Sequence, residues 1–237
     1  MGALRSQILK AQADLEKNQI AAEKAAAQAK DGMIVGLGTG STVLFAIQKL
    51  GELVRQGLKI QTVSSSVQSE KIATDLGIPA TSFDKIDKID LYIDGADEVD
   101  KNHFLIKGGG AALLREKILA HNSKRFVMVA DESKMVDTLG KFPLPVEIIP
   151  FGFELTLKNI RNFCPKAEIR SKDGKDVITD NGNLVADCYF GSIPDPAGLN
   201  QQLHAIPGVV ETGIFHQNIV SEVIIGFNDG TVRVYHR

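Results

Sequence analysis

The sequence predicts an α/β protein in which an open, mostly parallel sheet is accompanied by a smaller α+β domain. Over residues 31–134, short apolar runs alternate with helix-like segments, as in parallel βαβ units. From residue 143 onward, prolines and Asp-Gly and Asn-Gly turns mark two helices and several hairpins in an approximate βαββαβ order. We therefore expect a Rossmann-like domain over residues 1–142 and 216–237, and a ferredoxin-like domain over residues 143–215.

The first domain is predicted to begin with a helix, then a strand, a glycine loop and a second helix. Residues 7–30 are rich in Ala, Lys, Glu and Gln, which favour helix, and an Asp-Gly pair ends this segment. The apolar run 33–37 is typical of a strand buried on both faces. Residues 36–42 carry three glycines and lead into an apolar-periodic helix over residues 43–50.

Three further strands are predicted in this domain, at residues 59–63, 89–93 and 125–130. A helix over residues 67–76 and another after the glycines at 108–110 connect them. Polar residues follow each strand. In an open α/β sheet the ligand lies outside the carboxyl ends of the strands, so we expect these polar clusters to meet at one crevice.

The second domain is predicted to alternate strands with two helices. In chain order, the predicted elements are a strand at 146–149, a helix at 154–163, a strand at 167–170, a strand around 177–178, a strand at 184–189, a helix at 196–205 and a strand at 209–215. A final hairpin, 222–227 with 231–235, is expected to return to the first domain.

Composition favours a cytoplasmic protein with a small-molecule partner. The net charge is −2 and no run of Lys or Arg occurs, which argues against nucleic-acid binding. No apolar run approaches the roughly 20 residues needed to cross a membrane. Cys164 and Cys188 are far apart and follow no apolar signal segment, which favours a reducing compartment. The five histidines show no paired spacing, so we expect no metal.

An anion site is predicted where Lys107 precedes Gly108, Gly109 and Gly110 and a helix follows. Glycines let the backbone approach a ligand closely, and amides at a helix N-terminus hold oxyanions. Lys107 adds a full positive charge. Glu116 is expected about one and a half turns into this helix, facing the same cleft.

A second anion site is predicted in the loop that contains Thr39, Gly40, Ser41 and Thr42. Ser41 stands where a dinucleotide fingerprint needs a third glycine or alanine, and the second strand ends in serines rather than an acid. The lysine of a nucleotide-binding P-loop is missing too. The backbone and hydroxyls suit a phosphate monoester. The alternative is a tight strand-to-helix turn without a ligand.

Four acids, Asp94, Asp97, Glu98 and Asp100, lie within seven residues. Their spacing does not match a calcium loop, whereas magnesium is harder to exclude. We interpret Asp94 and Asp97 as working carboxylates because Asp94 directly ends a buried strand, and we expect Glu98 and Asp100 to be exposed. Carboxylates crowded near Glu116 would raise the pKa of at least one of them, which suits acid-base chemistry.

Four ordered motifs resemble those of ribose-5-phosphate isomerase, type A. They are Gly-Leu-Gly-Thr-Gly-Ser-Thr at 36–42, Asp-Gly-Ala-Asp-Glu-Val-Asp at 94–100, Lys-Gly-Gly-Gly-Ala-Ala-Leu-Leu-Arg-Glu-Lys at 107–117 and Ala-Asp-Glu-Ser-Lys at 130–134. The resemblance continues at residues 143–147, 179–183 and 206–210. Two positions depart from it: Leu114 stands where the family often has Thr, and Lys17-Asn18-Gln19 stands where members often carry adjacent lysines.

The resemblance implies interconversion of ribose 5-phosphate and ribulose 5-phosphate through an enediolate, without a cofactor. It assigns Glu116 as the base, and Asp94, Asp97 and Lys107 as the polar catalytic set. It also assigns substrate and phosphate contacts to Thr39, Ser41, Thr42 and Lys134.

The chemistry of the residues agrees with this assignment. Moving a proton between neighbouring carbons needs a base, a donor to the developing oxyanion and a group that relays hydroxyl protons. Glu116, the glycine-turn amides with Lys107, and either Asp94 or Asp97 fill these roles. Two alternatives stay open: a sugar-phosphate sensor that binds without turnover, and a coenzyme A transferase with Glu116 as nucleophile. We expect a homodimer or homotetramer, because symmetric oligomers are common among such enzymes.

Overall fold

The computed structural model describes residues 15–237, so the part of the first predicted helix before residue 15 lies outside the described residues. The chain forms two compact units. We call Met1–Gly95, Leu119–Lys134 and Val220–Arg237 the parallel-sheet unit, and Ala96–Ile118 with Met135–Ile219 the ferredoxin-like unit. The boundaries of these units differ from the predicted domain boundaries. The predicted domain boundaries stay a prediction.

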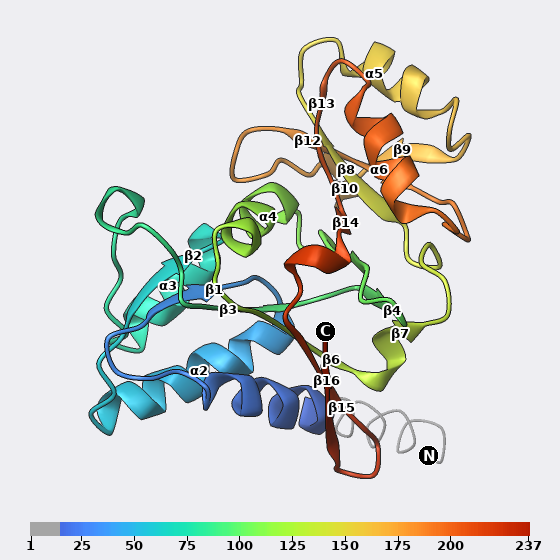
Figure 1. The fold of residues 1–237 in the computed structure, drawn as a ribbon. Coiled ribbons are helices and arrows are strands. Elements are labelled where there is room, and N and C mark those ends of the chain that lie inside the picture. The colour runs from blue at the N-terminus through green and yellow to red at the C-terminus, as the bar shows by residue number, and fades with distance from the viewer. Residues whose placement is uncertain (1–14) are drawn as a thin grey trace, which may run out of the picture. The chain divides into compact units, whose positions relative to one another are not determined.

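The parallel-sheet unit is built on a six-stranded sheet with the order β16-β15-β6-β3-β1-β2 (Figure 1). Strands β15, β6, β3, β1 and β2 are parallel, and β16 is antiparallel to β15. The chain therefore returns from β2 to the other side of β1, which makes the carboxyl ends of β1 and β3 a topological switch point. The strands are β1 Ile34–Leu37, β2 Gln61–Ser64, β3 Leu91–Gly95, β6 Phe126–Asp131, β15 Glu222–Gly226 and β16 Val232–His236.

Three helices cover the core of this unit: the first helix, helical over residues 15–26, α2 Ser41–Arg55 and α3 Val67–Asp75. Alternate residues of β1, β3 and β6 point into the core, where small alanines of the first helix let its backbone come close to the sheet. At Gly226 a Cβ atom would lie 2.1 Å from the carbonyl oxygen of Lys17, so β15 also approaches this helix closely. The final hairpin returns to this sheet as predicted.

The ferredoxin-like unit has a four-stranded antiparallel sheet with the order β13-β8-β12-β9. Its elements are β8 Leu144–Ile148, α5 Phe153–Ile160, β9 Ala167–Ile169, β12 Leu184–Cys188, α6 Pro196–His204 and β13 Val209–Thr212. The helices follow the first and third of these strands, which confirms the predicted βαββαβ order. A separate core that includes Leu144, Val146, Ala186 and Leu203 holds the unit together.

A second four-stranded sheet in this unit was not predicted. Its order is β14-β5-β4-β7, from Ile214–Phe215, Leu105–Ile106, Glu98–Asp100 and Met135–Val136. The predicted single strand 209–215 is therefore divided at Gly213, where a Cβ atom would lie 2.3 Å from the carbonyl oxygen of Lys107. The strand predicted around residues 177–178 is also wrong. A short hairpin, β10 Ser171–Lys172 with β11 Lys175–Asp176, precedes it, and Ile178 makes a single bridge to Leu184.

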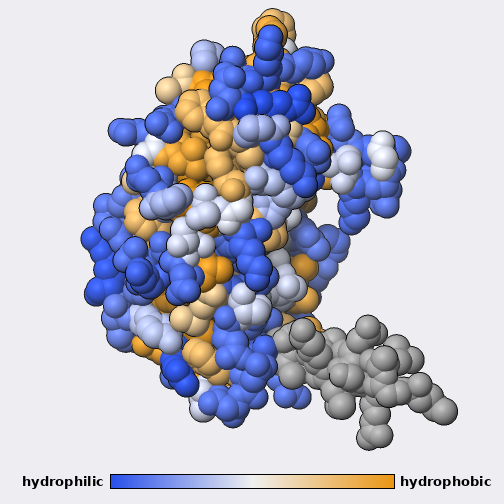
Figure 2. Space-filling view, turned by 90° about the vertical axis from the view of Figure 1, so that its right-hand side faces the viewer, coloured by the Kyte–Doolittle hydropathy of each residue, from blue (hydrophilic) through white to orange (hydrophobic). Residues whose placement is uncertain are grey.

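Polar and apolar residues share the surface. Figure 2 shows apolar residues in patches among polar ones on the face in view. The most exposed large apolar side chains belong to the ferredoxin-like unit, with Phe151 exposed by 88% and Leu155 by 70%. Within residues 15–237, no helix combines the length and the apolar character needed to cross a membrane.

Candidate active site

The predicted phosphate loop connects β1 to α2 in the parallel-sheet unit. Its turn depends on Gly40, which has φ 121°, a value that residues with a side chain rarely adopt. Because α2 begins at Ser41, the amides of Ser41 and Thr42 belong to the first turn of that helix. Amides in this position point out of the helix and carry partial positive charge, so the loop is suited to an anion.

Asp94 fastens this loop to the end of β3. Its side chain is fully buried, and Oδ1 accepts hydrogen bonds from the backbone N–H of Thr39 at 3.2 Å and of Gly95 at 2.7 Å. The hydroxyl of Tyr92 donates to Oδ2. At Gly38 a Cβ atom would lie 2.0 Å from Asp94 Oδ1, so only glycine leaves room for the carboxylate. In the structure the Asp94 carboxylate orders the loop, and its predicted catalytic role stays a prediction.

Serines after β2 support the same loop from another side. The Ser69 hydroxyl donates to the Gly38 carbonyl oxygen at 2.7 Å, and the hydroxyls of Thr39 and Ser65 are 2.7 Å apart. Sequence reasoning noted that β2 ends in serines but assigned them no contact with the loop. Their clustering after a strand was the available signal.

Asn18 of the first helix holds the Thr42 hydroxyl of the loop. Its Oδ1 accepts a hydrogen bond from the Thr42 hydroxyl at 2.9 Å, and its amide nitrogen lies 3.4 Å from Asp131 Oδ2. Asn18 is one of the positions at which the sequence departs from the family pattern. The departure therefore puts an amide that can both donate and accept beside Thr42.

Lys134 lies in a 3₁₀ helix, Glu132–Lys134, that directly follows β6. Burial raises the pKa of Asp131 at the end of β6. Hydrogen bonds from Ser133 and the charges of Lys134 and Lys17 lower this pKa by more, so that it lies below its ordinary value. Asp131 is therefore ionised near neutral pH. Lys134 contributes positive charge to this end of the sheet.

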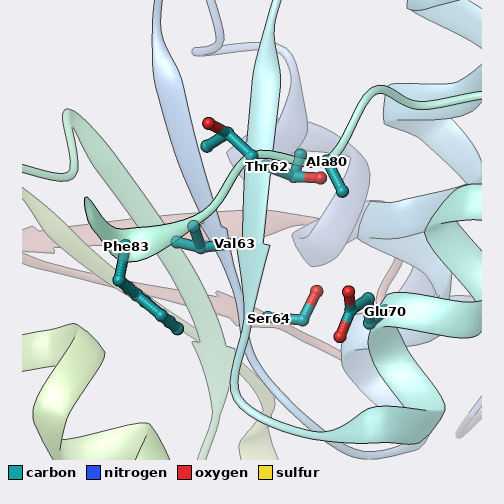
Figure 3. A pocket seen from close by; sticks show the side chains of 7 residues that line it. Thr62, Val63, Ser64, Glu70, Ala80 and Phe83 are labelled. Atoms are coloured by element: carbon teal, nitrogen blue, oxygen red, sulfur yellow. The ribbon is translucent and has the colours of Figure 1, made fainter. Parts of the chain in front are cut away.

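A small pocket in the parallel-sheet unit is lined by none of the predicted site residues. It is lined by β2, the start of α3 and the side chains of Ala80, Thr81 and Phe83, with Ser64 and Glu70 on one side (Figure 3). Its volume is about 60 Å³, whereas ligand sites for small molecules usually exceed about 300 Å³. It is too small for a sugar phosphate.

The ferredoxin-like unit holds the predicted base and its cation. Glu116 Oε2 lies 3.2 Å from Lys107 Nζ, and both side chains are only 3% exposed. Helix α4 spans Leu113–His121, so Glu116 lies in its first turn rather than one and a half turns in. The expected position was wrong because the turn after the glycines extends through Ala111, which has φ 58°, before the helix begins.

The glycine turn itself is held by Asp97. The N–H of Gly109 donates to Asp97 Oδ2 at 2.8 Å, and a Cβ atom on Gly109 would lie 2.5 Å from the other carboxylate oxygen. The N–H of Ala111 donates to the Gly108 carbonyl oxygen at 3.0 Å and closes the turn. Gly109 and Gly110 are exposed, so a ligand can approach the turn.

Glu98 and Asp100 were expected to be exposed, and this expectation is wrong. They are 3% and 8% exposed because both carboxylates accept hydrogen bonds from backbone N–H groups. Glu98 binds the amides of Gly140 and Phe142, and Asp100 binds those of Asn102 and Phe104. These two acids therefore stabilise loops and strand β4. Across residues 15–237, no group of three or more His, Cys, Asp or Glu side chains is arranged to hold a metal ion.

Lys117, the residue after the predicted base, belongs to an ion-pair network that sequence reasoning missed. Its Nζ lies 2.6 Å from Glu211 Oε1, which is also 2.9 Å from His204 Nε2. Burial raises the pKa of Glu211, but the His204 hydrogen bond and the Lys117 charge outweigh it and lower this pKa to about 2. The same hydrogen bond raises the pKa of His204 above its ordinary value. No sequence spacing links these residues, since 94 positions separate Lys117 from Glu211.

Comparison with known proteins identifies the family. The family model described as ribose 5-phosphate isomerase A (phosphoriboisomerase A) matches residues 61–230. The chain belongs to this family. A ribose-5-phosphate isomerase A from Bacillus mycoides is 51% identical over 213 residues, which cover 90% of this chain and 96% of the relative.

Solved structures of the family share the fold. A ribose 5-phosphate isomerase from Plasmodium falciparum has a TM-score of 0.89 at 37% identity and covers 93% of this chain and 97% of its own. A D-ribose-5-phosphate isomerase in complex with phospho-erythronic acid has a TM-score of 0.88 at 42% identity, with the same coverage of both chains. The sensor and coenzyme A transferase alternatives receive no support from these relatives.

The predicted site residues of this isomerase A chain lie in both units. The parallel-sheet unit brings Thr39 and Asp94 together, with Gly40, Ser41 and Thr42 in the same loop. The ferredoxin-like unit brings Lys107 to Glu116 and Asp97 to Gly109. Each unit therefore carries one internally connected set of family residues.

Proposed function

We propose that the chain interconverts ribose 5-phosphate and ribulose 5-phosphate through an enediolate, with Glu116 as the base. Family membership supports the overall reaction. The observation that carries the role of Glu116 is its pairing with Lys107 in a buried setting, at the first turn of α4 and beside the glycine turn. An ammonium beside a carboxyl group favours its charged form, which is the form that can accept a proton.

The proposed reaction moves one proton between two carbons. Glu116 takes the proton from carbon 2 of the open-chain aldose, and the electron pair of that C–H bond forms the carbon 1–carbon 2 double bond. The carbonyl oxygen on carbon 1 becomes the enediolate oxygen. Glu116 then returns the proton to carbon 1. A proton from the oxygen on carbon 2 is transferred to the oxygen on carbon 1, so that carbon 1 carries a hydroxyl group and carbon 2 carries the new carbonyl. Carbon 1 is reduced and carbon 2 is oxidised within the same sugar, so no external oxidant or reductant is needed.

Lys107 and the N–H of Gly110 in the glycine turn are proposed to stabilise the negative oxygen of the enediolate, since the N–H groups of Gly109 and Ala111 already donate to Asp97 and to the Gly108 carbonyl oxygen. Donors that are already in place before the charge develops contribute most to such stabilisation. The ordered turn at Gly108, Gly109 and Gly110 supports this role because Asp97 already holds it in one conformation. Asp97 and Asp94 are the candidates for relaying hydroxyl protons.

The phosphate group is proposed to bind the loop that contains Thr39, Gly40, Ser41 and Thr42. The first-turn amides of α2 and the Ser41 hydroxyl supply neutral donors, and Lys134 supplies charge. One solved relative is a complex with phospho-erythronic acid, a phosphorylated sugar acid. We propose that this chain binds the same class of compound, since a carboxylate resembles the two oxygens of an enediolate.

We further propose that the protein is cytoplasmic, needs no cofactor and forms a homodimer or homotetramer. Two-fold dimers are the commonest oligomers, and the exposed Phe151 and Leu155 offer apolar surface for a contact between two copies. Light scattering at micromolar concentration tests the assembly. A monomeric mass would contradict it.

The reaction itself is tested by adding ribose 5-phosphate to the purified protein in deuterated water and following the sugar by NMR. We expect ribulose 5-phosphate to form and deuterium to enter the carbon-bound position. Unphosphorylated ribose in a parallel sample should react much more slowly because it lacks the phosphate contact. The same activity is expected after exhaustive treatment with EDTA. Absence of turnover with ribose 5-phosphate would refute the proposed function.

A further inference from the structure

Arg170, which follows strand β9, reaches the carbonyl side of the glycine turn. One of its terminal nitrogens, Nη1, donates to the carbonyl oxygens of Gly108 at 2.8 Å and Gly109 at 3.1 Å. All three residues belong to the ferredoxin-like unit. Arg170 is 62 positions from Gly108 in the sequence, so no local motif connects them.

Asp187 of β12 fixes the direction of the guanidinium. Arg170 Nε lies 2.9 Å from Asp187 Oδ2 and Nη2 lies 2.6 Å from Oδ1, which is the two-bond geometry that arginine makes with a carboxylate. The two side chains are 14% and 16% exposed. The pair therefore holds Nη1 in a defined place instead of leaving a long side chain free to move.

The peptide group between Gly108 and Gly109 is consequently held on both sides. Its carbonyl oxygen accepts from Arg170, and its N–H donates to Asp97 at 2.8 Å. The peptide is planar and trans, so these two groups point in opposite directions. By the same geometry, the bond from Arg170 to the Gly109 carbonyl oxygen turns the N–H of Gly110 away from the guanidinium.

We propose that Arg170, held by Asp187, is a positioning residue that fixes the glycine turn in the orientation in which the N–H of Gly110 meets the enediolate oxygen. The proposal rests on the function proposed above. Three glycines in four residues have little intrinsic preference for one conformation, so the orientation has to come from contacts. The guanidinium also offsets the partial negative charge of two carbonyl oxygens close to the place where an oxyanion develops.

The test compares Arg170→Ala and Arg170→Lys with Arg161→Ala. Arg161 is a matched control because its Nε also binds a backbone carbonyl oxygen of the same unit, that of Ala167 at 3.0 Å, away from the glycine turn. Steady-state kinetics with ribose 5-phosphate gives kcat and KM separately. Hydrogen–deuterium exchange of the peptide segment 105–114, read by mass spectrometry, reports the order of the turn without using activity.

We expect Arg170→Ala to lower kcat about 10- to 100-fold, since a displacement of about 1 Å at a reacting centre costs on this order, with a small change in KM. Exchange over residues 108–111 should become faster. Lysine keeps the charge but cannot bind Asp187 at two points and the carbonyl oxygens together, so Arg170→Lys should also lose activity. Millimolar guanidinium ion should restore part of the activity of Arg170→Ala. Arg161→Ala should match the wild type in kcat and in exchange.

Wild-type kcat and wild-type exchange in Arg170→Ala would overturn the proposal. If Arg170→Ala does not fold, the test rests on Arg170→Lys. Wild-type kcat and wild-type exchange in Arg170→Lys would refute the positioning role. If the wild-type protein itself fails to isomerise ribose 5-phosphate, the proposed function is wrong. The exchange measurement still decides in that case whether Arg170 orders the turn.

Discussion

Lys107 Nζ lies 3.2 Å from Glu116 Oε2, and the two side chains are 3% exposed. An ammonium and a carboxylate that are buried together have lost most of their hydration, so each depends strongly on the other. The Lys107 ammonium also lies 5.3 Å from the centre of the Phe215 ring. Two predictions follow from this pair.

Glu116→Gln should remove most of the catalytic rate, and because it also removes one charge of a buried ion pair it should lower stability, so the rate is compared only after the variant is shown to be folded. Glutamine has nearly the same size but is not basic, and loss of a positioned base typically costs about 10²–10⁴ in rate. The measurement is entry of solvent deuterium into the carbon-bound position of ribose 5-phosphate. Glu154→Gln is the control, because Glu154 also lies in the first turn of a helix but is exposed. Exchange at the wild-type rate in Glu116→Gln would mean that another group is the base.

Lys107→Met should destabilise the protein more than the double variant Lys107→Met/Glu116→Gln. Removing one member of a buried ion pair typically costs about 3–5 kcal/mol, whereas removing both charges costs less. Denaturant unfolding of the wild type, both single variants and the double variant gives the coupling free energy. Additive effects of the two substitutions would show that the pair contributes no coupling.

Ser41→Ala and Thr42→Ala should raise KM for ribose 5-phosphate with a smaller effect on kcat, because the phosphate is bound equally in the ground state and the transition state. Thr42→Ala also removes a hydrogen bond to Asn18 and should have the larger effect. Ser82→Ala, an exposed position of the same unit, serves as the control. An unchanged KM in both variants would place the phosphate elsewhere.

Glu211→Gln should alter how stability depends on pH. The pKa of Glu211 is about 2, below its ordinary value of 4.5. A carboxyl group whose pKa is lower in the folded state stabilises the fold above its unfolded pKa, and this stability is lost as pH falls from about 4.5 towards 2. The variant should lose roughly 3 kcal/mol near pH 7 and show a shallower acid dependence. Urea unfolding at several pH values checks this, with Glu168→Gln as an exposed control.

Cys164 and Cys188 should resist thiol reagents in the folded protein. A hydrogen bond with Cys188 lowers the pKa of Cys164 to about 7, which favours the reactive thiolate, but the residue is only 2% exposed and Cys188 is fully buried. A chromogenic disulfide reagent should therefore label almost no thiol natively and two after denaturation. Fast labelling of one thiol under native conditions would show that burial does not control reactivity here.

The sequence by itself determined the features that depend on local patterns. Alternating apolar runs and helices predicted the parallel sheet, and hairpin turns predicted the βαββαβ unit, because strand and helix periodicity are properties of neighbouring residues. Glycines at 38, 40 and 108–110 located both turns, since backbone that adopts positive φ or passes close to a side chain excludes a Cβ atom. The same motif singled out Lys107 and Glu116, whose side chains lie 3.2 Å apart, and the role of Glu116 as the base stays a proposal.

The tertiary structure decided which polar groups meet. Glu98 and Asp100 look like exposed loop acids in the sequence, yet their carboxylates accept hydrogen bonds from backbone amides. The Gly140 amide that binds Glu98 is 42 positions away in the sequence. Ser69 beside the predicted phosphate loop and Arg170 beside the glycine turn come from segments that fold against these turns. Such contacts are fixed by how strands and helices pack, and one sequence contains no periodicity that records them.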